Sequence, residues 1–138
     1  MSIKHRSYCP IAFALDIFGD KWSLLILRDV LFKGKRHYQE FLESKEGIST
    51  NILANRLEML ESAGLLRKDE DPENGRRYVY SPTEKTFNLL PAMLEIVRWS
   101  TKYYRQTITE FASELNYDNR KIEMTVRSRF KRTVECEK

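Results

Sequence analysis

A stripe of leucines in the middle of the chain is the feature that most limits its possible folds. Leucine recurs there at spacings of four and then three residues, which places the side chains on one helix face: Leu53, Leu57 and Leu60. Ser49 is a preferred N-cap residue, because its hydroxyl accepts a backbone N–H of the first turn. Gly64 can adopt the left-handed conformation that ends helices. The pattern predicts an amphipathic helix over residues 50–63 whose leucines face a core.

The segment before this helix predicts a second, shorter helix. Residues 37–43 carry Tyr38, Phe41 and Leu42 at three- and four-residue spacing. Gly47 then supplies a turn. A short helix, a tight turn and a second helix form a helix-turn-helix arrangement.

After Gly64 the pattern becomes that of a β-hairpin. Residues 65–69 and 77–81 are the predicted strands, and the second is rich in β-formers. The segment between them, Asp71-Pro72-Glu73-Asn74-Gly75, is dense in turn residues, and its Asn74-Gly75 pair is strongly favoured in two-residue hairpin turns. A hairpin that directly follows a helix-turn-helix is a wing.

Two apolar helices are predicted before this unit. Pro10 suits the first turn of a helix over residues 10–18, because its missing N–H needs no partner there. Asp20 is the predicted N-cap of the next helix, which ends at Gly34. This second helix is apolar around most of its circumference, which indicates burial on nearly all sides.

Beyond the wing, Thr83 is predicted to cap a helix with apolar residues as far as Trp99. Pro91 should kink that helix or restart it as a second one. The stretch from residue 116 is polar and basic, which predicts a poorly packed tail. The predicted fold class is mainly α with a small β-hairpin wing: a winged helix-turn-helix domain over residues 1–115, followed by a basic tail over residues 116–138.

Composition narrows the class of protein further. A length of 138 residues fits one domain, and a net charge of +4 permits a polyanionic partner without requiring one. The two cysteines, Cys9 and Cys136, form no zinc-ligand spacing and suit a reducing compartment. We expect a cytoplasmic protein, because no stretch has the character of a signal peptide or a membrane span.

An enzyme is a poor interpretation of this sequence. Only His5 and His37 could serve as histidine bases. Neither has a nucleophile or an orienting acid at a sequence spacing that is typical of a catalytic motif. No phosphate-cradling glycine loop, hydrolase elbow or metal cluster is visible. We therefore expect no catalytic residue, no metal and no cofactor.

The outward face of the helix over residues 50–63 is the predicted DNA-reading surface. If the leucines face inward, four short side chains without negative charge face outward near the N-terminus: Thr50, Asn51, Ala54 and Asn55. Asparagine can pair with adenine through two hydrogen bonds, and threonine or alanine can contact a thymine methyl group. The helix N-terminus, with Ser49, favours a phosphate. The alternative is an ordinary solvated helix face.

Basic residues outside this face are predicted phosphate or wing contacts. A loop before the short helix carries Lys33, Lys35, Arg36 and His37. We expect them to contact phosphates, and a solvated loop is the alternative. Arg56 could bind a phosphate or pair with an acid near Glu58 and order the helix.

The wing tip carries Asn74, Arg76 and Arg77, which could enter a minor groove where arginine is favoured electrostatically. The alternative is a charged tip that stays in solvent and does not contact DNA. Four nearby acids favour it, because they offset the charge of the arginines: Asp69, Glu70, Asp71 and Glu73.

Several short motifs together resemble the HxlR-type regulators, winged-helix proteins similar to the MarR group. They are Cys9-Pro10, GDKWSLLILR at 19–28, GKRHY at 34–38, GIS at 47–49, RLEMLE at 56–61, AGL at 63–65 and YSPTEK at 80–85. The resemblance implies a homodimer on a partly palindromic operator, with terminal helices forming the dimer contact. The residues expected in that contact are Leu94, Val97, Trp99 and Tyr103.

The resemblance also draws attention to Cys9, because some members of this family are similar to redox sensors with a cysteine at this position. A thiolate near a helix N-terminus has a lowered pKa, and Cys9 precedes Pro10 at such an end. The alternative is a small buried residue in the dimer contact.

The sequence thus predicts a sequence-specific DNA-binding transcriptional regulator that acts as a homodimer on double-stranded DNA, with no membrane partner. Trp99, Tyr103 and Tyr104 could line either a dimer groove or an effector pocket. The alternative function is a winged-helix protein–protein interaction module without sequence-specific DNA binding, because a fold does not fix a function.

Overall fold

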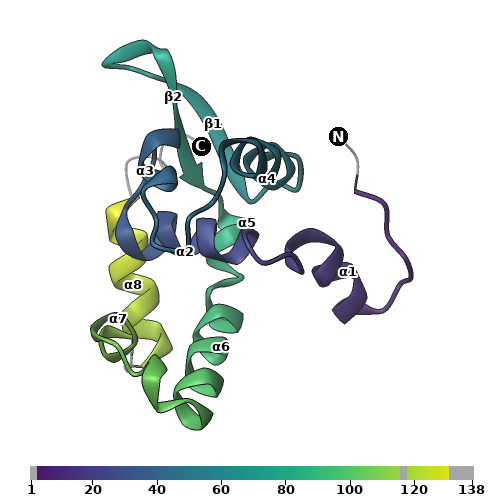
Figure 1. The fold of residues 1–138 in the computed structure, drawn as a ribbon, viewed down its shortest axis with the longest axis vertical. Helices are drawn as coiled ribbons and strands as arrows, with labels where there is room; N and C mark the ends of the chain where they lie inside the picture. The colour runs from purple at the N-terminus through teal and green to yellow at the C-terminus, as the bar shows by residue number, and fades with distance from the viewer. Residues whose placement is uncertain (1–2, 116–117, 131–138) are drawn as a thin grey trace. The chain divides into compact units, whose positions relative to one another are not determined.

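The structure is a computed structural model that describes residues 3–115 and 118–130 (Figure 1). The chain divides into two compact units, residues 1–86 and 87–138. In order, the helices and strands are α1 Pro10–Phe18, α2 Ser23–Lys33, α3 Tyr38–Leu42, α4 Thr50–Ser62, β1 Leu66–Asp71, β2 Asn74–Pro82, α5 Glu84–Phe87, α6 Leu90–Tyr103, η1 Arg105–Thr107, α7 Glu110–Glu114 and α8 Asn119–Arg129. This confirms the predicted winged helix-turn-helix order.

Helix α2 begins two residues after the predicted position, because Asp20 caps it from a preceding turn. The Asp20 carboxylate accepts the backbone N–H of Trp22 and of Ser23, each at 3.0 Å, and the Ser23 hydroxyl at 2.5 Å. The helix ends at Gly34, where φ is +67°. Apolar side chains of α2 form much of the core of the first unit: Ile26, Leu27, Val30 and Leu31.

Helix α4 has the predicted orientation. The Ser49 hydroxyl accepts the Ile52 N–H at 3.4 Å and caps the first turn. Leu53, Leu57 and Leu60 are all buried. Gly64 follows the helix with a φ of +76°, a conformation that glycine adopts without a Cβ penalty.

This conformation predicts a contrast between two glycines. Gly64→Ala should lower the free energy of unfolding by about 1–2 kcal/mol, the cost of left-handed backbone for an L-residue. Gly75→Ala should be neutral or slightly stabilising, because its φ is not left-handed and no described residue other than its chain neighbours comes within 4 Å of the added Cβ. Urea unfolding of both variants tests this, and equal midpoints would contradict it.

The wing contains a correction to the predicted turn. Asp71 pairs with Asn74, so the hairpin turns over Pro72 and Glu73, and Asn74-Gly75 begins the return strand. A type I′ turn would need positive φ at both Asn74 and Gly75, and neither has it. Proline instead provides the φ of a common turn, and Asp71 Oδ1 accepts the Glu73 N–H at 2.9 Å.

The junction after the wing differs from the predicted cap. The Thr83 hydroxyl donates to the Gly64 carbonyl at 2.5 Å instead of capping α5. The Thr86 hydroxyl donates to the Leu65 carbonyl. Both bonds tie the start of α5 to the end of α4. Pro91 lies in the first turn of α6, which confirms the predicted restart.

The prediction of a poorly packed tail is wrong for residues 118–130. They form α8, which contacts α6 and buries Ile122, Val126 and Phe130. Arg127 lies over the Phe87 ring at 4.6 Å, and Arg98 donates to Asn119 Oδ1. The remaining tail residues lie outside the described residues, and the extent of the functional domain, residues 1–115, stays a prediction. None of the described helices is both long and apolar enough to span a membrane.

Candidate nucleic-acid interface

The outward face of α4 is free of acids over its first turn and exposes all four predicted base readers. Thr50, Asn51, Ala54 and Asn55 are exposed, whereas the leucines of the opposite face are buried. Short polar and methyl-bearing side chains at an open helix N-terminus match the donor, acceptor and methyl groups of a DNA major groove. Helix α4 also lies against strand β1 of the wing (Figure 1).

Helix α3 fixes the start of α4. The Tyr38 hydroxyl donates to the Thr50 carbonyl at 3.1 Å. The Glu40 carboxylate accepts the backbone N–H of Arg36 at 3.2 Å and of His37 at 3.1 Å. These bonds hold the loop, the short helix and the N-terminus of α4 in one arrangement.

Arg56 pairs with an acid, although not with one near Glu58. Its Nη1 lies 3.3 Å from Asp20 Oδ1, and its Nε donates to Asn55 Oδ1 at 3.0 Å. Desolvation alone would raise the pKa of Asp20, but hydrogen bonds from Ser23 and Trp22 and the charge of Arg56 together lower it. A phosphate contact for Arg56 stays a prediction.

The basic loop is anchored to the protein rather than freely solvated. Lys35 Nζ donates to the Ser44 hydroxyl at 3.0 Å and lies 3.6 Å from the buried Asp29 carboxylate. Arg36 Nη2 donates to the Ser81 hydroxyl at 2.6 Å, and the Arg36 carbonyl accepts the Tyr80 N–H at 2.8 Å. The loop therefore runs along β2, and only part of its charge faces outward.

At the wing tip the two arginines have different surroundings. Arg77 Nε lies 2.5 Å from the buried Asp71 carboxylate, which offsets its charge. The Glu73 N–H and Arg77 both lower the pKa of Asp71. Arg76 is exposed, and its guanidinium has no partner among the described residues. The Arg76 backbone N–H donates to Asn74 Oδ1 at 3.1 Å, which shapes the tip.

An ion-pair network near the turn before α4 was missed by the sequence reasoning. Arg28 binds Glu46 through both terminal nitrogens, at 2.8 and 2.9 Å, and also contacts Asp29. The Arg28 hydrogen bond lowers the pKa of Glu46 to about 2. The network ties α2 to the turn at Gly47. Periodicity cannot reveal a pair of charges 18 residues apart.

Cys9 occupies the N-cap position of α1 and is exposed. Backbone N–H groups of Ala12 and then Ile11 lower the pKa of its thiol. Helix α1 buries none of its own residues, and Ile11 is 72% exposed. The thiol is thus accessible at the start of an apolar helix that lacks cover within the described chain.

In the second unit, the residues expected in a dimer contact differ in exposure. Leu94 is 1% exposed, so it belongs to the core of this unit and presents no surface to a partner. Val97 is partly buried. Trp99 and Tyr103 are 58% and 62% exposed, with ring centroids 5.8 Å apart. These two rings leave a sizeable apolar surface on α6.

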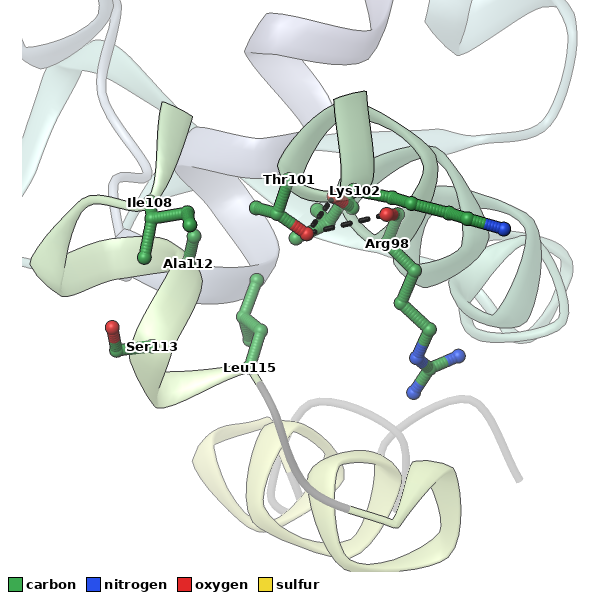
Figure 2. A pocket seen from close by; sticks show the side chains of 8 residues that line it. Arg98, Thr101, Lys102, Ile108, Ala112, Ser113 and Leu115 are labelled. Carbon is green, nitrogen blue, oxygen red and sulfur yellow. Dashed lines mark hydrogen bonds between the residues drawn. The ribbon is translucent and has the colours of Figure 1, made fainter. Parts of the chain in front are cut away.

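A pocket of about 330 Å³ lies in the second unit between α6 and α7 (Figure 2). Its lining includes Val97, Arg98, Thr101, Ile108 and Leu115. None of the three aromatic residues expected in an effector pocket, Trp99, Tyr103 and Tyr104, lines it. The prediction of an aromatic effector pocket gains no support from this pocket.

Comparison with known proteins finds relatives that are regulators. The HxlR-like helix-turn-helix family matches residues 17–108. An uncharacterised HTH-type transcriptional regulator of Synechocystis is 34% identical over 102 residues, which are 74% of this chain and 75% of that protein.

Two solved structures share the fold. The reduced form of the transcriptional regulator YodB from B. subtilis has a TM-score of 0.58 and 28% identity, covering 71% of this chain and 96% of that one. The oxidised form of the redox regulator HypR has a TM-score of 0.60 and 27% identity, covering 68% of this chain and 96% of that one.

The family match spans α2, the helix-turn-helix, the wing and α6, and so includes α3, α4 and the hairpin that build the interface described above. The fold, the exposed N-terminal face of α4 and the relatives therefore all point to a helix-turn-helix regulator. The chain belongs to the HxlR-like helix-turn-helix family of transcriptional regulators, not to a family of enzymes.

Proposed function

We propose that this regulator binds double-stranded DNA sequence-specifically, as a homodimer on a partly palindromic operator. The observation that carries the proposal is the division of α4 into a buried leucine face and an exposed face of short, uncharged side chains. The exposed face enters the major groove with its N-terminus foremost, as recognition helices do. Thr50, Asn51, Ala54 and Asn55 contact base edges there.

Phosphate contacts surround this face in the proposal. The N-terminus of α4, with Ser49, binds one phosphate through its free backbone N–H groups. Lys35 and Arg36 in the loop before α3, and Arg56 on α4 itself, contribute positive charge. Arg76 at the exposed wing tip enters the adjacent minor groove, with Asn74 and Arg77 beside it.

Exposed apolar surface supports dimerisation. Ile11 and Leu15 on α1 are exposed, as are Trp99 and Tyr103 on α6. Apolar groups on a protein surface gain free energy when a partner removes them from water. A two-fold dimer would place its α4 helices roughly 34 Å apart, one turn of duplex.

The test begins with selection of bound sequences from random duplex DNA by the full chain. Fluorescence anisotropy then compares the selected duplex with a scrambled one over a range of salt concentrations. We expect at least about 10³-fold tighter binding to the selected duplex and a linear fall of log affinity with log salt. Equal affinities for the two duplexes would instead favour the protein-interaction module.

We further propose that oxidation of Cys9 alters DNA binding. The support is an exposed thiol of lowered pKa and the similarity to the redox regulator HypR. A peroxide would convert the thiolate to a sulfenic acid, with one peroxide oxygen transferred to sulfur and the other released as hydroxide.

Cys9→Ser should abolish the response of DNA affinity to hydrogen peroxide, because serine cannot be oxidised in this way. Affinity is measured before and after peroxide for the wild-type chain, Cys9→Ser and Cys136→Ser. A response that persists in Cys136→Ser assigns it to Cys9 alone, whereas loss in both variants indicates a disulfide. A wild-type chain without a response would contradict the proposal.

A further inference from the structure

The side-chain amide of Asn55 is held in one orientation by its neighbour. Arg56 Nε and Nη2 donate to Asn55 Oδ1 at 3.0 and 2.5 Å. A guanidinium has only donors, so the amide must turn its oxygen toward Arg56. The remaining amide group, Nδ2, carries two N–H donors and no acceptor. Asn55 is exposed, so these donors can meet a partner outside the protein.

Asp20 holds Arg56 in place. Arg56 Nη1 lies 3.3 Å from Asp20 Oδ1, and both side chains are largely shielded, with 21% and 26% exposed. The Asp20 carboxylate is itself fixed by the N–H groups of Trp22 and Ser23. The start of α2 therefore supports Arg56, and Arg56 in turn orients the amide of Asn55 on α4.

We propose that Arg56 is a positioning residue that makes Asn55 a donor-only reader, selective for guanine over adenine. The inference rests on the DNA-binding function proposed above. Guanine presents two neighbouring acceptors, N7 and O6, in the major groove. Adenine presents one acceptor, N7, and one donor, the N6 amino group, which needs the amide oxygen of an asparagine. With that oxygen bound to Arg56, Asn55 matches guanine and leaves adenine with one contact.

Asn51 provides an internal reference on the same helix face. It lies one turn earlier than Asn55 and is exposed. No hydrogen bond among the described residues reaches its amide. Asn51 can therefore turn either way and keeps the adenine pairing of an unrestrained asparagine.

The experiment measures base preference at single operator positions with the full chain. Asn55→Ala and Asn51→Ala first locate the position that each residue reads, as the position where discrimination is lost. Competition binding with all four base pairs at each position then gives the guanine-to-adenine ratio for the wild-type chain and for Arg56→Met. A ratio is the right readout, because the lost charge of Arg56 weakens binding to every duplex alike.

The wild-type chain should prefer guanine at the position of Asn55 by about fivefold or more, the lower end of what one well-placed contact contributes. Arg56→Met frees the Asn55 oxygen and should move that preference toward adenine by about tenfold, within the range that a bidentate base contact contributes. The preference at the position of Asn51 should not change.

Each possible result bears on the inference in a different way. Adenine preference at the position of Asn55 in the wild-type chain overturns it, and this measurement needs no variant of Arg56 to fold. An unchanged guanine-to-adenine ratio in a folded Arg56→Met also overturns it, because the restraint would then have no role in specificity. Neither result affects the proposed function, which fails only if the wild-type chain selects no sequence.

Discussion

Leu57→Ala is expected to lower the free energy of unfolding of the first unit by about 2–5 kcal/mol, as truncation of a buried leucine does. The side chain is 2% exposed and lies between Leu53 and Leu60 on the buried face of α4. Its removal leaves a cavity that close-packed neighbours fill only in part. A small domain has about 5–15 kcal/mol of stability, so this loss is a large fraction of the total. Urea unfolding followed by circular dichroism measures it.

Glu58→Ala is the matched control for this variant. Glu58 is the next residue on α4 and is exposed, so its truncation should change stability by no more than about 0.5 kcal/mol. Both variants replace one side chain of the same helix by alanine, and they differ mainly in burial. Equal destabilisation by the two would mean that the leucine face of α4 is not part of the core.

Structural features that depend only on residues close together in the chain could be predicted from the sequence. The leucine spacing of α4, the cap at Ser49 and the left-handed Gly64 all act within one or two helical turns. The same holds for Pro10 at the start of α1 and for the restart at Pro91. These local signals agree with one another, and for that reason the helix-turn-helix could be predicted from them.

The turn lies within the predicted segment, residues 71–75, but not at the favoured Asn74-Gly75 pair, because two local signals compete. Asn74-Gly75 favours a turn with positive φ, whereas Pro72 after Asp71 favours a common turn two residues earlier. The second signal prevails, with the Asp71 carboxylate bound to the Glu73 N–H. Composition therefore located the hairpin correctly but not its register.

Contacts between distant residues were beyond the sequence reasoning. Arg28 with Glu46 and Arg36 with Ser81 join residues 18 and 45 positions apart, and no periodic pattern encodes them. Helix α8 was missed for a different reason, because polar residues dominate its composition. Its apolar residues recur every four positions, at Ile122, Val126 and Phe130, and that spacing was the signal that could have predicted it.

Ala54→Glu is expected to weaken DNA binding by about 100-fold or more, for selected and random duplexes alike. Ala54 is exposed at the centre of the proposed reading face, between Asn51 and Asn55. A carboxylate there would face the negative potential of the duplex and would be desolvated on entering the groove. Like-charge juxtaposition of this kind costs several kcal/mol, and about 2.7 kcal/mol corresponds to 100-fold. Fluorescence anisotropy at fixed salt measures the loss.

Ser62→Glu adds the same charge to the same helix at its other end and provides the control. Ser62 is exposed and lies eight residues further along α4, about 12 Å away at the rise of an α-helix. If the N-terminal face of α4 meets DNA, Ser62→Glu should change affinity by no more than about fourfold, because an exposed charge beyond a Debye length is largely screened. Similar weakening by the two variants would show that net charge alone governs binding, and the outward face of α4 would no longer be the candidate for reading DNA.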